Sequence, residues 1–187
     1  MGKHSILALC AIVLSFPACA YQFQGRSNPL QKLGVHKIYV RQFDNKTYRP
    51  GVEQMFSSAM VKEIQKFRSF ELVGSPEAAD AVLTGEVTNV ASDRSSNRQV
   101  RLGAIKDVDI ASEFTATVLC SIQLMDKQSR IIFSQVVSGS KIYPGSVRTG
   151  DEGATVPLVN DSEQRLAVQF VASQMMASVY QRMIDTF

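Results

Sequence analysis

The most regular alternation of hydrophobic and polar residues lies between Ile110 and Met125. Hydrophobic residues fill most even-numbered positions there: Ile110, Phe114, Ala116, Val118, Cys120, Ile122 and Leu124. Because successive side chains of a strand point to opposite faces, this period of two predicts a long strand with one buried face. A polar break at Asp126–Ser129 and a second apolar run from Ile131 predict a β-hairpin with a short turn. Helices elsewhere in the chain must cover its apolar face.

Apolar residues recur at helical spacing after Pro50. Proline suits the first position of a helix, because its missing N–H would be unpaired there anyway. The apolar stripe that follows consists of Val52, Met55, Phe56, Ala59, Met60, Ile64 and Phe67. Each fully buried residue of this kind contributes ~1.5 to 3 kcal/mol, so we expect the helix to cover the sheet.

A second helical segment follows Asn160 or Asp161, either of which can cap it. Its apolar residues fall into two sets, although a helix that covers one sheet needs only one stripe. One set is Leu166, Phe170, Ala177 and Ile184, and the other is Val168, Ala172, Met175, Val179 and Met183. Either the helix makes a broad core contact, or Met175, Val179 and Met183 form an interface with another protein. Flexible methionines adapt to irregular partners, which favours the interface slightly.

Three further strands and two long loops complete the expected elements. The strands are Val35–Phe43, which ends in a turn at Asp44, Phe70–Val73 and Ala81–Val90; the loops are Ser92–Asp109, which is polar and basic, and Gly139–Val159, which is rich in Gly, Pro and Ser. A strand, a helix and another strand prefer a right-handed crossover, so we expect a parallel pair. The predicted fold class is α+β, a two-layer fold with an about four-stranded mixed sheet and two helices packed on it.

The composition fits a folded protein that does not bind nucleic acid. Of the 187 residues, 45% are hydrophobic and 20% are charged. The formal net charge is +3, and removing a leader that contains Lys3 lowers it to about +2. That charge is too small for a general nucleic-acid binder.

Residues 1–18 have the features of a secretory signal peptide. Lys3 precedes an apolar run that ends in small residues and is too short to span a membrane as a mature helix. Cleavage before Cys19 would give a lipidated N-terminal cysteine, whereas cleavage after Ala20 is also possible at the sequence Ala18-Cys19-Ala20. The balance favours lipidation of Cys19.

Lipidation of Cys19 sets the expected location and organisation of the mature chain. Ala20 is not the Asp that commonly retains lipoproteins in the inner membrane, so we expect a lipid anchor in the outer membrane, on its periplasmic side. A tether would then cover residues 19–34, and a single α+β domain would cover residues 35–187.

The sequence offers no recognisable catalytic, metal or cofactor motif. It lacks the G-x-S-x-G, H-E-x-x-H, P-loop and Rossmann glycine patterns, and His36 is the only histidine after the leader. The three cysteines have neither C-x-x-C spacing nor a nearby histidine that would indicate a metal or redox site. We therefore expect a protein that is not an enzyme and that binds no metal and no cofactor.

Several short strings and the order of elements resemble the LptE family of lipopolysaccharide (LPS)-assembly outer-membrane lipoproteins. The strings are Cys19 to Phe23 with Gly25, Ile38 to Val40 with Phe43 to Tyr48, Pro50 to Glu53, and Ala79 to Val87. The resemblance implies a sheet of about four strands with two helices, lodged as a plug inside the LptD β-barrel. It also implies a role in barrel assembly and in LPS delivery to the outer leaflet. The alternatives are a periplasmic adaptor or secretion-apparatus lipoprotein without LPS contact, and a soluble periplasmic ligand-binding domain.

The resemblance makes basic residues candidates for contact with the anionic phosphates of lipid A. Two groups qualify: Lys127 with Arg130 at the hairpin turn, and Arg94, Arg98, Arg101 and Lys106 in the first loop. A tight turn fixes its charges, whereas ordering a loop costs ~1 to 2 kcal/mol per residue, so the turn is preferred. The alternative is that both groups are ordinary solvated charges.

Overall fold

The computed structural model describes residues 29–102, 106–149, 155–158 and 160–185. In chain order its elements are α2 (Pro29–Lys32), β1 (Lys37–Val40), β2 (Asp44–Asn45), α3 (Val52–Phe67), β3 (Glu71–Leu72), the 3-10 helix η1 (Pro76–Ala78), β4 (Ala81–Leu102), β5 (Lys106–Asp126), β6 (Ile131–Pro144), β7 (Ser146–Thr149), β8 (Thr155–Leu158) and α4 (Asp161–Asp185). The predicted leader and Cys19 lie outside the described residues.

The main sheet is mixed and six-stranded, in the order β3-β1-β4-β5-β6, with β2 also paired to β4. β1 pairs in parallel with both β3 and β4, whereas β4, β5 and β6 form an antiparallel meander. The α+β class, the parallel pair and the hairpin are therefore confirmed. The strand number of about four is wrong. β3 lies within the expected strand Phe70–Val73, whereas β2 was not expected, because its two residues are too few to show an alternation. Asp44 belongs to β2 rather than only to a turn.

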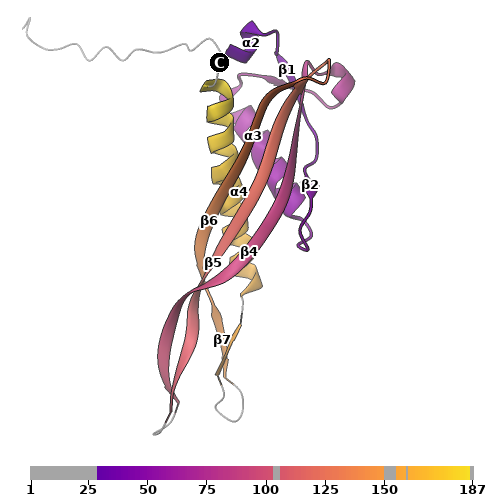
Figure 1. The fold of residues 1–187 in the computed structure, drawn as a ribbon. Coiled ribbons are helices and arrows are strands. Elements are labelled where there is room, and N and C mark those ends of the chain that lie inside the picture. Colours follow the sequence, from indigo (N-terminus) through magenta and orange to yellow (C-terminus); the bar gives the residue numbers. More distant parts are fainter. Residues whose placement is uncertain (1–28, 103–105, 150–154, 159, 186–187) are drawn as a thin grey trace, which may run out of the picture.

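Helices α3 and α4 lie side by side along one face of the sheet (Figure 1). The even-numbered residues of β5 from Phe114 to Leu124 point to that face and are all buried, as the alternation predicts. Gly51, whose φ of 86° is readily adopted only by glycine, leads the chain into α3. Three rather than two α-helices are present among the described residues, since the short α2 adds its buried Leu30 to the same core.

The burial of Leu30 also moves the boundary of the folded part. The side chain is 0% exposed, so α2 belongs to the domain and not to a tether that ends at residue 34. A boundary at residue 35 is therefore too late in the chain.

The exposed face of α4 is not the face that the sequence analysis favoured as an interface with another protein. Met175, Val179 and Met183 are 4%, 0% and 0% exposed, so they leave no surface of this chain that another protein could contact. The reason is that α4 contacts α3 as well as β5 and β6, and two neighbours require a wider apolar face. The broad core contact is the correct alternative, and the apolar residues left exposed on α4 are Leu166 and Phe170.

Both predicted loops contain strands instead. β4 continues to Leu102 and pairs with β5 as far as Lys106, with register shifts between Val87 and Asn89 and again between Arg94 and Asn97. β6 extends to Pro144, and β7 and β8 form a separate two-stranded sheet beside β5. The expectation of a loop over Ser92–Asp109 is wrong because, among the described segments, no helix covers this part of the hairpin (Figure 1), so its residues need not alternate in polarity.

Cys120 provides a direct test of the buried face. It is a free cysteine, 0% exposed, and burial raises the pKa of its thiol to about 12. Because thiolate is the reactive form, we expect Cys120 to resist alkylation in the native protein at pH 8 and to react fully in denaturant. Fast labelling of the folded chain would contradict the assigned face of β5. A Ser121→Cys variant in a Cys120→Ala background, facing the other side, is the matched control.

Candidate functional site: the charged end of the sheet

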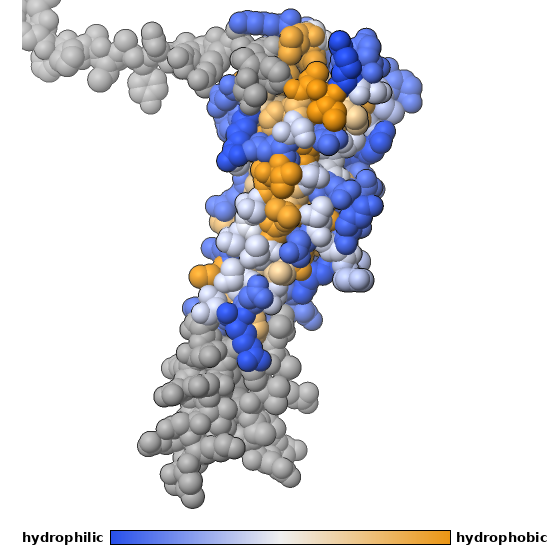
Figure 2. Space-filling model, in the orientation of Figure 1, coloured by the Kyte–Doolittle hydropathy of each residue, from blue (hydrophilic) through white to orange (hydrophobic). Residues whose placement is uncertain are grey.

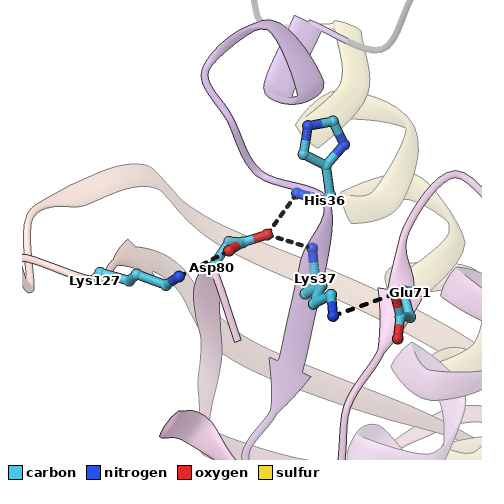
Figure 3. Close-up of polar contacts among 5 residues, drawn as sticks. All are labelled: His36, Lys37, Glu71, Asp80 and Lys127. Atoms are coloured by element: carbon cyan, nitrogen blue, oxygen red, sulfur yellow. Dashed lines mark hydrogen bonds and ion pairs between the residues drawn. The ribbon is translucent and has the colours of Figure 1, made fainter. Parts of the chain in front are cut away.

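Asp80 ties together three segments at one end of the sheet (Figure 3). Its Oδ2 accepts hydrogen bonds from the backbone N–H groups of His36 at 3.0 Å and Lys37 at 2.9 Å. Its Oδ1 lies 3.0 Å from Nζ of Lys127, in the β5–β6 turn. Lys37 also extends its own Nζ to within 3.8 Å of Oε2 of Glu71 on β3. One carboxylate thus joins the start of β1, the start of β4 and the turn.

The side chain of Asp126, at the start of the β5–β6 turn, holds the turn in its conformation. Oδ1 of Asp126 accepts the backbone N–H groups of Gln128 and Arg130, each at 2.9 Å. Oδ2 accepts from Nε of the Arg130 guanidinium at 2.7 Å and lies 2.7 Å from its Nη2, so two nitrogens share one oxygen. Ser129 has a φ of 59° and completes the tight turn. The geometry is fixed as the sequence predicts, but the charge of Arg130 is already paired.

The hydrogen bond from Lys127 lowers the pKa of Asp80 to about 2, and the backbone N–H groups of Lys37 and His36 add to this effect. A carboxyl whose pKa is lower in the folded than in the unfolded chain stabilises the fold above its unfolded value, near 4, and this contribution is lost as the pH falls toward 2. The cluster therefore stabilises the fold at neutral pH and loses that effect in acid.

We expect Asp80→Asn to lower the free energy of unfolding at pH 7 and to differ less from the wild type at pH 3. Urea unfolding at pH 7, 5 and 3 measures both differences. Glu77→Gln is the matched control, because Glu77 is an exposed carboxylate of the same end of the sheet. An equal pH dependence in wild type and Asp80→Asn would contradict the role of Asp80.

The arrangement is poorly suited to capturing an anion without rearrangement. Lys127 and Arg130, the preferred candidates for phosphate contact, each contact a carboxylate, and the hollow beside Lys127 is also lined by Glu77, Asp80 and Asp126. A phosphate would have to displace or share those carboxylates. The cluster also does not resemble a metal centre: within the described residues, no three His, Cys, Asp or Glu side chains are grouped to hold an ion.

The second basic group lies on the β4–β5 hairpin. Arg94 is exposed on β4, opposite Phe114 on β5. Arg98 and Arg101 follow on β4, and Lys106 begins β5. The sequence predicted these residues in a loop, whereas two paired strands hold their backbones. Strand pairing already orders these backbones, so the loss of conformational entropy that counted against this group does not occur on binding.

A buried series of polar side chains, which the sequence analysis did not predict, lies where the helices meet the hairpin. Gln164, on α4, is 0% exposed. Its Oε1 accepts from Nη1 of Arg49 and its Nε2 donates to Oγ of Ser92. That hydroxyl lies 2.8 Å from Oη of Tyr143 on β6. The only available signal was a glutamine at a position where the helical stripe is otherwise apolar.

The sheet face that turns away from the helices carries separated apolar residues. Exposed hydrophobic side chains there are Leu119 on β5 and Ile131, Val136 and Ile142 on β6. Serines and threonines lie between them, and Figure 2 shows the hydrophobic residues as a broken band over these strands. Among the described segments, no helix has the length and hydrophobicity needed to cross a membrane.

Comparison with known family models shows to which family the chain belongs. The family model named LptE, lipopolysaccharide-assembly, matches residues 35–183. The chain belongs to the LptE family. For this LptE-family chain, the match includes α3, the meander β4–β6 and nearly all of α4, and it begins just before β1.

The DUF330 structure supports the fold of this LptE-family chain, and two further solved structures are similar to it at lower TM-scores. A Xanthomonas campestris protein of the DUF330 family has a TM-score of 0.53 at 12% identity, covering 81% of this chain and 85% of its own. Lipoprotein B from Nitrosomonas europaea has a TM-score of 0.48 at 11% identity, covering 81% and 84%. The PelC dodecamer subunit from Paraburkholderia phytofirmans has a TM-score of 0.47 at 13% identity, covering 78% and 86%. The search of curated proteins gave no match.

Proposed function

We propose that this LptE-family chain is an outer-membrane lipoprotein, anchored through Cys19 on the periplasmic side, that acts as plug and assembly partner of the LptD β-barrel. In this role it helps to carry LPS to the outer leaflet and performs no catalysis. The observation that supports the proposal most strongly is the LptE family match over residues 35–183. The long, one-sided fold, with an open sheet face of alternating hydroxyl and apolar residues, is compatible with contact to a surrounding barrel.

Two measurements test the anchor and the partner. Palmitate labelling of the wild type and of Cys19→Ser should give a labelled and an unlabelled protein, respectively. The tagged wild-type chain, extracted from membranes in detergent, should recover LptD in near-equal amount. A wild-type chain that is labelled but recovers no LptD would favour an adaptor or secretion-apparatus lipoprotein, and an unlabelled chain cut after Ala20 would end the lipoprotein proposal.

We further propose that lipid A phosphates meet the β4–β5 hairpin rather than the β5–β6 turn. The physical reason is that Lys127 and Arg130 are paired with Asp80 and Asp126, so their charges are largely compensated. Arg94 is exposed and, within the described residues, has no ion pair.

The corresponding prediction compares LPS binding by two double variants of the full chain. Arg94→Gln with Arg98→Gln should weaken binding about tenfold at low salt, and less at high salt, because charge contacts to phosphate are screened by ions. Lys127→Gln with Arg130→Gln should change it by less than about threefold. Surface plasmon resonance on immobilised LPS over a salt series measures both. The reverse order would restore the turn as the contact, and no change in either variant would remove the electrostatic contact altogether.

A further inference from the structure

The outer side of the α3–α4 pair forms a groove of continuous polar and basic character. The two helices run in the same direction, because residues near the start of α3 share hollows with the start of α4, and Phe67 near the end of α3 stacks on Tyr180, ring centroids 4.9 Å apart. Two hollows of about 380 and 230 Å³ follow one another along this groove, and Met55 and Arg165 line both.

Three cations line the groove, with one carboxylate among the lining residues. The cations are Arg49, Lys62 and Arg165, and the carboxylate is Asp161. Within the described part of the chain none of the three cations makes an ion pair; Arg49 donates to the neutral amide of Gln164 instead. This differs from the sheet end, where Lys127 and Arg130 each contact a carboxylate. The lining of the groove therefore carries a net positive charge, with three cations against one carboxylate.

The spacing of these charges indicates the shape of what they would bind. Arg49 lies just before α3 and Lys62 lies in its third turn, so at ~1.5 Å per residue the two ends of the groove are roughly 15 to 20 Å apart. Arg165 lies between them, because it lines both hollows. A single phosphate is too small to meet all three cations. An extended chain of about five residues, at ~3.3 Å each, has the required length.

The rest of the groove suits a polypeptide backbone. Side-chain amides and hydroxyls of Gln54, Ser58, Gln169 and Ser173 supply donors and acceptors between the cations. Below them, Val52, Met55 and Val168 form an apolar floor. Donors and acceptors of this kind can pair with the N–H and C=O groups of an extended chain.

We propose that the α3–α4 groove binds an extended acidic segment of a protein partner, whose Asp or Glu carboxylates meet Arg49, Lys62 and Arg165. This inference rests on the proposed function in one respect: the barrel protein is the partner expected to supply the segment. The groove is separate from the hairpin and from the turn considered for LPS, since it lies on the helical side of the molecule.

The first test uses the full chain and a labelled eight-residue peptide that alternates Glu and Ser, with binding measured by fluorescence anisotropy. Lys62→Gln with Arg165→Gln should weaken binding about tenfold or more, because two charge contacts are lost. Lys32→Gln with Arg41→Gln is the control, since it removes the same charge from exposed residues away from the groove. Equal weakening by both variants would show non-specific attraction and overturn the proposal.

Two competitors distinguish a peptide from other anions. Inorganic phosphate and vesicles of phosphatidylglycerol should displace the peptide only at concentrations that act through ionic strength. Displacement by either at low concentration, lost in the groove variant, would identify a phosphate or membrane site and overturn the peptide proposal. Failure to displace supports it.

A second test separates this inference from the proposed function. Lys62→Glu with Arg165→Glu should reduce the LptD recovered with the tagged chain at least threefold, while circular dichroism and thermal melting stay unchanged because both residues are exposed. Undiminished recovery would overturn the groove as the contact and leave the proposed function standing. If the wild type recovers no LptD, the proposed function fails, and the peptide measurement then decides the inference alone.

Discussion

Gly85→Val is expected to cost the protein more stability than any other single substitution considered, about 3 kcal/mol or more. Gly85 lies on β4 opposite Ile122, and a Cβ placed there would be 2.5 Å from Cδ2 and 2.6 Å from Cζ of the Phe43 ring. The ring cannot simply move away, because Phe43 is 2% exposed and its backbone N–H donates to Oγ of Ser57 at 2.9 Å. Valine favours strands, so destabilisation would be due to the clash alone.

Urea unfolding of three variants tests this clash. Gly85→Ala should lose about 1 to 3 kcal/mol, and Thr84→Val, on the opposite face of the same strand, should lose little. Combining Gly85→Ala with Phe43→Leu should cost less than the sum of the two single losses, since the smaller side chain makes room. Strict additivity would show that Phe43 is not the residue that excludes a side chain at position 85.

Gln164→Leu is expected to lower the free energy of unfolding by about 2 to 4 kcal/mol. The leucine has a similar volume, but it leaves the guanidinium of Arg49 and the hydroxyl of Ser92 without the amide that each contacts. A buried group that loses its hydrogen-bond partner costs about 1 to 3 kcal/mol, which sets the range. Thermal or urea unfolding measures the loss.

The exposed Gln169, on the same helix, supplies the control for this substitution. Gln169→Leu should change stability by less than about 0.5 kcal/mol. Ser92→Ala should cost less in the Gln164→Leu background than in the wild type, because the Ser92 hydroxyl has already lost the Gln164 amide and only its contact with Oη of Tyr143 remains. A Gln164→Leu variant as stable as the wild type would show that water satisfies these groups and that the network contributes nothing.

The sequence predicted the fold best where one face of an element is buried and the other is not. β5 satisfies this condition from Phe114 to Leu124, and α3 satisfies it from Val52 to Ile64, so both were found with the correct face. Phe67, the last residue of the predicted α3 stripe, is exposed. Beyond Ser92 none of the helices that the structure describes covers the β4–β5 hairpin, and its composition therefore resembles that of a loop. For α4 the number of apolar positions was informative, but the sequence could not show that α3 takes up the surplus.

The candidate sites divide in the same way. The turn that holds Lys127 and Arg130 was predictable from Asp126 and the polar residues after it. The pairing of Lys127 with Asp80 was not, because it joins residues far apart in the chain. The grouping of cations in the groove was also not predictable, because Arg49, Lys62 and Arg165 come together only when α3 and α4 pack in the same direction.

The position of β1 between β3 and β4 has a consequence for the order in which the chain can fold. Ile38 pairs with Leu72 on one side and Ala81 on the other. β1 therefore cannot pair until β3 and β4, which are synthesised later, are available. The meander β4–β6 pairs neighbours in sequence and needs no such delay, and contacts between distant segments are the slow ones. The core then remains open on one side until α4, the final element of the described chain, arrives. We therefore expect β4–β6 and α4 to fold first and β1 to join the sheet afterwards. A chain that ends before residue 160 should stay unfolded and be cleaved by proteases.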